Sequence, residues 1–413
     1  MPQERTFRFL IRLTRSYLRM RSCRVCVSGS LKSIHRPQLR SLSKLMIFKQ
    51  FGHSQPRPIT ALAAVNSTRS FEDRTPSALT SRATTQTSTP RNFATSSLTV
   101  NMNSYPAPRP DIMHSKEPFI HDVFHNESGT WQYLIVDPSS SAAAIVDPVL
   151  DFNPATRVIS TKAANSLLSL IVESGYHIDR ILETHVHADH LTAAFYLQRR
   201  LAEVQGFTPP IGIGKRVDQV QALFGARYGV PPEEYQCVFD KLFDDDEAFQ
   251  IGTLDITAIH LPGHTPDHMG YKVGDNVFCG DSLFIADIGT ARCDFPGGSA
   301  RDLYTSAKKL LSFSDDVKIW TGHDYPSDSR GQPMSWMSVK EHKERNRHVM
   351  TSITEEQFLA IRNGRDAGLN EPKLLHQSLQ VNLRGGRLPK PNATGERLLH
   401  LPLVVKEVSS LNL

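Results

Sequence analysis

The chain has 413 residues, a formal net charge of +5 and 39% hydrophobic residues, which is enough for a sizeable folded core. The charge is divided unevenly, because residues 1–100 hold 17 Lys and Arg against three acids, a net charge of +14, and the rest of the chain carries −9. An acidic body gives no support for nucleic acid binding, and no apolar run approaches the roughly 18 residues of a membrane span, so we expect neither nucleic acid as a partner nor membrane insertion.

The first 110 residues have the composition of a targeting segment followed by a linker. Arginines recur at helical spacing among apolar residues near the start, and Ser, Thr and Pro dominate the sequence before residue 110. A basic amphipathic helix that is poor in acids is typical of a mitochondrial transit peptide. We therefore predict a mitochondrial targeting segment and disordered linker over 1–110, and a protein of the mitochondrial matrix. Translation from Met102 or Met113 is the alternative, and it predicts a cytoplasmic protein.

Folded sequence is expected from about residue 117, where strand and helix patterns begin to alternate. The predicted strands cover residues 131–136, 142–146, 252–261, 276–279 and 317–320, and the predicted helices cover 162–173, 191–202, 217–228 and 300–313. Strands with helices between them favour a layered α/β architecture. The acidic run at 244–247 is interpreted as a solvated turn before a strand and not as a calcium site.

A short segment rich in metal-binding residue types follows a strand end at 181–182. It reads Thr-His-Val-His-Ala-Asp-His and contains His185, His187, Asp189 and His190. Imidazole nitrogens and carboxylate oxygens are ligands that zinc and non-haem iron share. A polar loop that happens to be rich in histidine is the alternative, but residues of these types this close together have no evident packing role. We therefore predict a metal site here.

Three more predicted strands run into a histidine or an aspartate. These residues are His264, Asp281 and His323, and each directly follows a glycine. Glycine lets the backbone turn sharply and approach a site closely. Loops on a rigid scaffold are where ligands usually bind, so the three residues join the motif as candidate ligands.

Four motifs occur in an order that resembles the metallo-β-lactamase superfamily. They are Thr-His-x-His-x-Asp-His, Gly-His-Thr-Pro, Gly-Asp and Gly-His. The resemblance covers about residues 117–345 and implies an α/β fold, an αββα sandwich whose metal site lies at the edge of two sheets. It makes 117–345 the catalytic domain and leaves 346–413 as a C-terminal extension that packs on it.

Two subfamilies fit, and they differ in chemistry. Glyoxalase II-like enzymes hydrolyse glutathione thioesters with a water that bridges two metals, whereas persulfide dioxygenases, also called sulfur dioxygenases, oxidise glutathione persulfide to sulfite at one ferrous iron. The sequence Ile-Gly-Thr-Ala-Arg-Cys-Asp-Phe-Pro-Gly-Gly at 288–298 resembles a bacterial and fungal branch of the dioxygenases, and so do His-Asp-Tyr at 323–325 and the segment 372–385. Glyoxalase II has Arg-Phe-Phe-Glu-Gly at the first of these places. Two departures, Val186 and Gly385 where human-type dioxygenases have Cys, touch no metal ligand.

The dioxygenase resemblance implies a role for each candidate ligand. His185, His264 and Asp281 become the catalytic facial triad on one Fe(II) per chain, with positions left open for persulfide sulfur and dioxygen. The partners are then glutathione persulfide and O2. Family members are often dimers, so we expect a homodimer.

The four other metal-competent residues leave an alternative open. His187, Asp189, His190 and His323 either support the triad or complete a second metal site. In the second case the protein is a hydroxyacylglutathione hydrolase with two zinc ions. A catalytically silent scaffold would lack at least one residue of the triad, and none is lost.

Four residues are predicted to bind glutathione. Arg292 and Tyr325 follow ligand loops, and a guanidinium suits a carboxylate. Asn382 and Arg384 are further candidates of the same kind. The alternative for Arg292 is an ion pair with Asp294, or with another nearby aspartate, that fixes the loop.

Overall fold

The computed structural model describes residues 117–404. The predicted targeting segment at 1–110 lies outside the described residues, as does the chain from residue 405 onward. None of the helices between residues 117 and 404 is long and apolar enough to cross a membrane.

Two six-stranded sheets and one small sheet make up the β-structure of residues 117–404. The first sheet has the order β1 (Phe119–His125), β2 (Thr130–Val136), β3 (Ala142–Val146), β6 (His177–Leu182), β8 (Ile211–Gly214) and β9 (Lys241–Phe243). The second has the order β10 (Glu247–Ile251), β11 (Leu254–His260), β12 (Met269–Val273), β13 (Asn276–Phe278), β14 (Lys318–Trp320) and β15 (Trp336–Ser338). The small sheet has the order β5 (Val158–Ser160), β4 (Val149–Asn153) and β7 (Leu191–Thr192).

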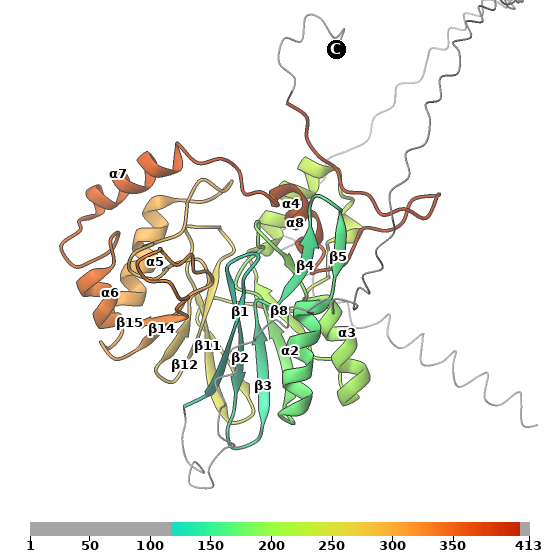
Figure 1. The fold of residues 1–413 in the computed structure, drawn as a ribbon, viewed down its shortest axis with the longest axis horizontal. Coiled ribbons are helices and arrows are strands. Elements are labelled where there is room, and N and C mark those ends of the chain that lie inside the picture. The colour runs from blue at the N-terminus through green and yellow to red at the C-terminus, as the bar shows by residue number, and fades with distance from the viewer. Residues whose placement is uncertain (1–116, 405–413) are drawn as a thin grey trace, which may run out of the picture. The chain divides into compact units, whose positions relative to one another are not determined.

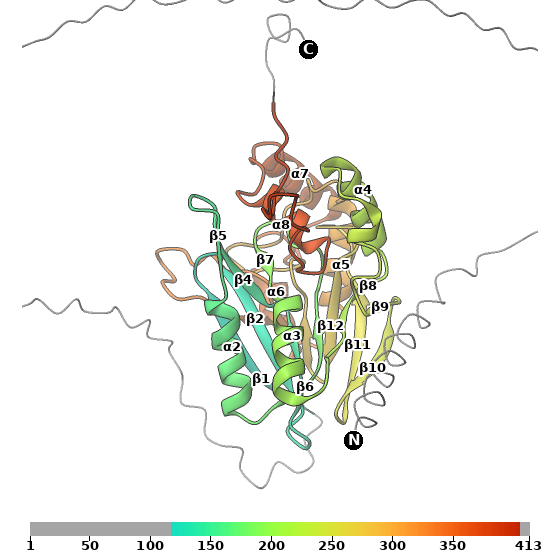
Figure 2. The ribbon, with the colours of Figure 1, turned by 90° about the vertical axis from the view of Figure 1, so that its right-hand side faces the viewer.

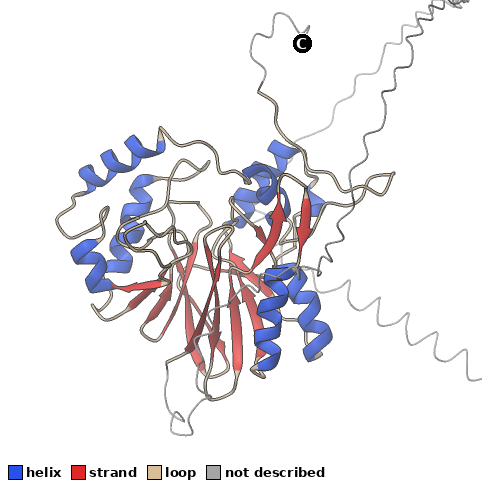
Figure 3. Ribbon diagram, viewed as in Figure 1, coloured by secondary structure: helices blue, strands red, loops and turns tan. Residues whose placement is uncertain are grey.

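Helices cover the outer face of each large sheet, so the layers follow the order α, β, β, α (Figures 1 and 3). Outside the first sheet lie α2 (Lys162–Glu173) and α3 (Ala194–Gln205), and outside the second lie α5 (Ala300–Leu311), α6 (Val339–Arg345) and α7 (Glu355–Asp366). At one end, near the small sheet, lie α4 (Val217–Tyr228), the short 3-10 helix η3 (Pro232–Glu234) and α8 (Leu375–Asn382) (Figure 2). The predicted αββα sandwich is therefore confirmed.

Strand β2 shows how the two large sheets share a core. All of its residues are buried, and alternate side chains point to opposite faces of the sheet. Tyr133 packs between the sheets against Phe278, with 5.0 Å between the ring centroids. Leu134 points the other way, into the apolar cluster beneath α2 and α3 that contains Leu167 and Leu197. A strand with two apolar faces is what the middle layers of a four-layer sandwich require.

One predicted helix begins in the wrong place. Helices α2 and α4 have the predicted bounds, but the helix expected from residue 191 begins only at Ala194. Leu191 and Thr192 instead form β7 and pair with β4. The cause is a contact with a distant part of the chain, because the Thr192 N–H donates to Oδ1 of Asn382 at 2.9 Å. Local periodicity carries no information about such a partner.

The acidic run at 244–247 forms a turn that leads into β10, as predicted. Asp244 pairs with Lys215, and Asp245 pairs with Arg216. Surface cations therefore satisfy these charges, as expected of a solvated turn.

Residues 346–404 contribute two helices that contact the rest of the fold. Helix α7 packs on α5, and α8 packs on β7 and α4. Phe358 of α7 is fully buried in the apolar cluster that covers the second sheet. This segment therefore lies against the loops that follow the central strands.

Candidate metal centre

Three loops bring His185, His264 and Asp281 together. His185 follows β6 of the first sheet, His264 follows β11 of the second, and Asp281 follows β13. All three side chains are buried, and one ligand atom from each lies within 4.8 Å of the others. We call these residues the first donor set. Their role as metal ligands stays a prediction, but the structure places them where one ion can contact all three.

Hydrogen bonds fix which nitrogen of each histidine faces the site. Nδ1–H of His264 donates to the Arg292 carbonyl at 2.7 Å, which leaves the Nε2 lone pair 3.7 Å from Oδ2 of Asp281. Nδ1–H of His185 donates to Oγ1 of Thr184 at 2.9 Å, and the Thr184 hydroxyl donates to Asp147 at 2.8 Å. Partners of this kind orient metal-binding imidazoles.

Two buried atoms of the first donor set lack hydrogen-bond partners. Within the described part of the chain, Nε2 of His185 and Oδ1 of Asp281 are buried and accept no hydrogen bond. Buried polar atoms are normally paired, so an unpaired nitrogen and an unpaired carboxylate oxygen that share one site fit a bound cation. Gly322 keeps that site open, because a Cβ there would lie 2.5 Å from Oδ1 of Asp281.

Two carboxylates that were not predicted hold His187. Its Nε2 lies 3.1 Å from Oδ1 of Asp147 and 3.2 Å from Oε2 of Glu183. Burial by itself lowers the pKa of His187, but the Asp147 and Glu183 carboxylates outweigh it and raise the pKa well above the ordinary value. Asp147 directly follows β3, and its backbone has φ of +48°. Its position after a predicted strand end is the signal by which the sequence could have identified it.

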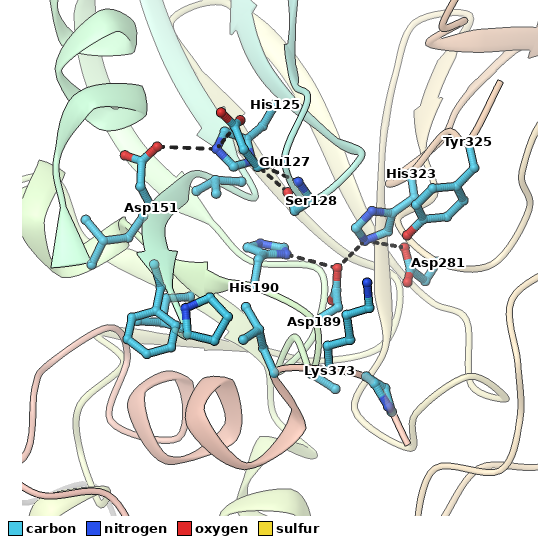
Figure 4. A pocket seen from close by; sticks show the side chains of 18 of the residues that line it. His125, Glu127, Ser128, Asp151, Asp189, His190, Asp281, His323, Tyr325 and Lys373 are labelled. Carbon is cyan, nitrogen blue, oxygen red and sulfur yellow. Dashed lines mark hydrogen bonds and ion pairs between the residues drawn. The ribbon is translucent and has the colours of Figure 1, made fainter. Parts of the chain in front are cut away.

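Asp189, His190 and His323 form a second group beside the first, which we call the second donor set (Figure 4). Oδ2 of Asp189 lies 3.3 Å from Nδ1 of His190 and 3.1 Å from Nε2 of His323. Nε2 of His323 also lies 3.6 Å from Oδ1 of Asp281, so the two sets touch. Asp189 and His190 lie together with His187 as a further group that could hold a metal ion.

A cavity of about 1010 Å³ opens onto this cluster. Its lining includes His264 and Asp281 of the first donor set and all of the second. Arg292 and Tyr325 line it too, although their binding of glutathione stays a prediction, and the Tyr325 ring stacks on His323 with 5.8 Å between the centroids. The Arg292 guanidinium forms a bidentate pair with Asp294, which is the alternative that the sequence left open for it.

Asn382 and Arg384 do not line the cavity, so the structure adds no support for their predicted contact with glutathione, which stays a prediction. Nδ2 of Asn382 donates to the carbonyls of His187 and His190 at 2.8 Å each, so this amide holds the backbone of the metal motif. Arg384 is buried against Glu234, with 2.8 Å between the paired atoms. Both residues belong to the C-terminal segment that also contributes Lys373 to the cavity wall, but their own side chains are buried in the fold.

Two cations that were not predicted line the cavity instead. They are Arg365 and Lys373, and neither forms an ion pair with an acid of residues 117–404. Lys373 reaches the cavity from the segment between α7 and α8 (Figure 4). Unpaired cations on a cavity wall are available to an anionic ligand.

Helix α7 also supports the first donor set. Arg362 is fully buried, and it donates to the Thr290 carbonyl at 2.9 Å and to Asp366. Asp366 in turn accepts from the Cys293 N–H at 2.8 Å. The pair therefore fixes both ends of the segment that contains Arg292, whose carbonyl orients His264.

Comparisons with known proteins agree with this fold and site. Residues 125–323 match the model of the metallo-beta-lactamase superfamily. The chain is 40% identical over 280 residues to Glyoxylase B2 of Dictyostelium discoideum, a match that covers 67% of this chain and 94% of that protein. It is 39% identical over 296 residues to a probable metallo-hydrolase of Burkholderia pseudomallei, a match that covers 69% of this chain and 98% of that protein.

Similarity to persulfide dioxygenases is weaker but extends along their length. The chain is 27% identical over 270 residues to human mitochondrial persulfide dioxygenase ETHE1, covering 65% of this chain and 88% of that protein. The crystal structure of ETHE1 from Myxococcus xanthus matches with a TM-score of 0.51 and 26% identity, covering 65% of this chain and all of that one. From its sequence, its αββα fold and its cluster of metal-competent side chains, this chain belongs to the metallo-β-lactamase superfamily.

Proposed function

We propose that the protein is a persulfide dioxygenase that oxidises glutathione persulfide with O2 to sulfite and glutathione, using one Fe(II) per chain. The observation that carries the proposal is the first donor set, in which two imidazoles and one carboxylate meet at a cavity. Two histidines and one carboxylate on one face of an ion are the ligands of non-haem Fe(II) oxygenases. The similarity to ETHE1 proteins supports the same assignment.

His185 and His264, each through Nε2, and the Asp281 carboxylate would hold the iron. When bound there, Fe(II) supplies the redox chemistry that joins dioxygen to sulfur. The chain supplies orientation. The Arg292 carbonyl and the Thr184 hydroxyl fix the two imidazoles before any ion arrives, so little rearrangement is needed on binding.

The cavity wall would position the substrate. Glutathione carries two carboxylates, and Arg365 and Lys373 are the lining cations that no acid of the described chain engages. Tyr325 offers an aromatic face and a hydroxyl beside the second donor set. Arg292 contributes its carbonyl to His264, while its guanidinium stays with Asp294.

A second candidate function rests on His187, Asp189 and His190, a group that overlaps the second donor set and could hold another ion. The Asp281 carboxylate lies 3.7 Å from His264 and 3.6 Å from His323, so it could contact an ion on either side. The protein would then be a hydroxyacylglutathione hydrolase with two zinc ions. The names of the relatives from Dictyostelium discoideum and Burkholderia pseudomallei agree with such a hydrolase.

One experiment separates the two candidates. The protein is purified without oxygen, its metals are counted, and oxygen uptake is followed with glutathione persulfide. We expect about one iron per chain and uptake of oxygen, because of the two donor sets only the first has buried, unpaired ligand atoms on both a histidine and a carboxylate. Two zinc ions per chain, no oxygen uptake and cleavage of a glutathione thioester would establish the hydrolase instead.

The proposed location and assembly can be tested separately. Residues 1–110 fused to a fluorescent protein should direct it to mitochondria, and a cytoplasmic signal would favour translation from Met102 or Met113. Light scattering of the purified protein should give the mass of a homodimer. A mass of about 46.2 kDa, that of one chain, would contradict it.

A further inference from the structure

His268 is a fully buried histidine that directly precedes β12. Its backbone is held on both sides. The His268 carbonyl accepts from the Leu261 N–H at 2.9 Å. The next residue, Met269, donates its N–H to the Thr184 carbonyl at 2.7 Å. The imidazole therefore projects from a rigid point of the fold, beside the loop that follows β6.

The His268 ring contacts two residues of the first donor set. It stacks on His185, with 4.8 Å between the ring centroids and 26° between the ring planes. Its Nε2 accepts from the Asp281 N–H at 2.9 Å. His185 follows a strand of the first sheet and Asp281 follows a strand of the second, so one side chain connects candidate ligands of both sheets.

The Asp281 amide decides the tautomer of His268. A backbone N–H can only donate, so Nε2 carries the lone pair and the ring proton lies on Nδ1. The Nε2 lone pair is directed at the amide and is not available to a metal ion. Nδ1 is buried, and it has no hydrogen-bond partner among residues 117–404. His268 therefore contacts the candidate ligands without being one of them.

Packing alone does not account for a histidine at this position. A buried N–H group without a partner destabilises a fold, and an apolar ring would stack on His185 without introducing one. An apolar ring, however, offers no acceptor to the Asp281 amide. The acceptor at Nε2 is thus what the imidazole provides in return for the unpaired Nδ1–H.

Gly280 leaves the space that the imidazole occupies. Its φ is +48°, and a Cβ at this position would lie 2.9 Å from Nε2 of His268 and 2.6 Å from Oγ1 of Thr184. The Thr184 hydroxyl accepts from His185, so a side chain at residue 280 would displace the partners of both ligand loops. The close approach of His268 to the Asp281 amide depends on this glycine.

We propose that His268 is a positioning residue of the metal centre, which holds the Asp281 backbone and the His185 ring in the arrangement that binds the ion. The inference rests on the proposed function only in that the first donor set binds a metal, and it applies to iron and to zinc alike. Loss of a group that orients metal ligands typically reduces metal affinity or activity about 10-fold to 100-fold. An effect of this size is therefore expected from a residue that never touches the ion.

Three variants separate the acceptor of His268 from its ring. In His268→Phe an aromatic ring can still stack on His185, but the Asp281 amide loses its acceptor. In His268→Gln the side-chain oxygen is as many bonds from Cα as Nε2 is, so it can accept from the amide. In His268→Asn the side chain is one bond shorter and does not reach the amide.

The measurements follow metal binding in place of turnover. Affinity for Fe(II), without oxygen, and for Zn(II) is measured by competition with a chelator, and the visible absorption of the Co(II)-loaded protein reports the geometry of the ligands. We expect both affinities to fall roughly 10-fold to 100-fold in His268→Phe and His268→Asn, with altered Co(II) absorption. His268→Gln should restore most of the affinity and the wild-type absorption.

A buried histidine at the other end of β6 provides the control. His121 lies 2.8 Å from the Tyr176 hydroxyl through its Nε2, and Tyr176 directly precedes β6, whereas His185 follows that strand. His121→Phe removes a buried imidazole and its hydrogen bond without changing the loops of the first donor set. Metal affinity and Co(II) absorption should therefore equal those of the wild type.

Two outcomes would overturn the proposal. One is wild-type metal affinity in His268→Phe or His268→Asn. The other is an equal loss in His268→Gln and His268→Asn, which would mean that the ring packs and that its acceptor has no role. If His268→Phe does not fold, the comparison of the Gln and Asn variants decides by itself, because these two side chains differ only in reach.

The proposed function and the role of His268 fail in different ways. Absence of oxygen uptake by the iron-loaded wild-type protein with glutathione persulfide contradicts the dioxygenase, whatever the variants bind. The role of His268 is decided by the ratio of metal affinities between variant and wild type, which needs no turnover. A zinc hydrolase would leave that ratio as informative as a dioxygenase does.

Discussion

The two donor sets differ in how their charged groups are satisfied. Asp189 of the second set already pairs with His190 and His323, at 3.3 and 3.1 Å. In the first set, within the described chain, Nε2 of His185 and Oδ1 of Asp281 are buried and accept no hydrogen bond. In the second set the carboxylate is paired with both histidines and only Nε2 of His190 is buried and unpaired, whereas the first set has such atoms on both a histidine and a carboxylate. This contrast is the physical basis for expecting one metal ion and not two.

Removal of one predicted ligand of the first donor set should have the largest effect of the variants considered. His264→Ala deletes a donor of the first set, so we expect iron content and oxygen uptake to fall together to background. His190→Ala is the matched variant in the second set, and it should still bind about one iron per chain. Metal analysis and an oxygen electrode give both values.

Two outcomes would contradict this expectation. Full iron in His264→Ala without activity would mean that the first donor set is not the ligand set. Equal loss of metal in both variants would mean that the two sets act as one site with two ions, as the hydrolase requires.

The next largest effect concerns the support of the first donor set by α7. Arg362→Met leaves the Asp366 carboxylate buried without its cation, and breaking a buried pair costs about 3–5 kcal/mol. We expect the free energy of unfolding to fall by about that amount in urea titrations. The looser segment at 290–293 should also weaken iron binding, because its Arg292 carbonyl orients His264.

A surface ion pair provides the control for that variant. Arg301 pairs with Glu355 at the start of α7, and its side chain is 69% exposed. Arg301→Met should change the free energy of unfolding by about 1 kcal/mol or less. If both variants lose equal stability, the buried pair has no special role in holding the helix against the metal centre.

Positions after strand ends predicted the candidate ligands, and the resemblance to the dioxygenases selected three of them. His185 follows β6 of the first sheet, His264 and Asp281 follow β11 and β13 of the second, and these loops bring the side chains together. Strands and helices that alternate predicted only a layered α/β architecture, and the αββα order of the layers was implied by the resemblance to the metallo-β-lactamase superfamily.

The supporting contacts could not be predicted in this way. Asn382 reaches the His187 carbonyl across 195 residues, and Arg362 reaches Thr290 across 72. Only tertiary packing decides whether a polar side chain of the C-terminal segment points into the cavity or into the fold. The contacts of the Asn382 amide with the metal motif were missed for this reason, and the start of α3 was misplaced for the same reason.

A variant of Asn382 tests whether the backbone around His190 of the second donor set affects iron binding. Asn382→Ala removes two hydrogen bonds to the backbone of the metal motif, to the carbonyls of His187 and His190. Loss of a group that orients metal-binding residues typically costs 10-fold to 100-fold in metal affinity or activity, so we expect roughly that range for iron affinity. Competition with a chelator measures it.

An exposed asparagine on α7 is the control for this variant. Asn363→Ala should leave iron affinity unchanged, because the side chain points to solvent. Wild-type iron affinity in Asn382→Ala would show that the metal motif keeps its conformation without these two hydrogen bonds from α8.

The smallest expected effect lies on the cavity wall. Lys373→Met removes a cation that no acid of residues 117–404 engages, so the ground-state binding of an anionic substrate should weaken. We expect KM for glutathione persulfide to rise about 5-fold with kcat unchanged, since one lost ion pair at a half-open site is worth about 1 kcal/mol. Lys340→Met, an exposed position on α6, should leave both constants unchanged. Salt provides a further check, because screening should raise KM in the wild type more than in Lys373→Met. A fall in kcat at constant KM would contradict this role. Lys373 would then act on the reacting atoms in the transition state and not in substrate recognition.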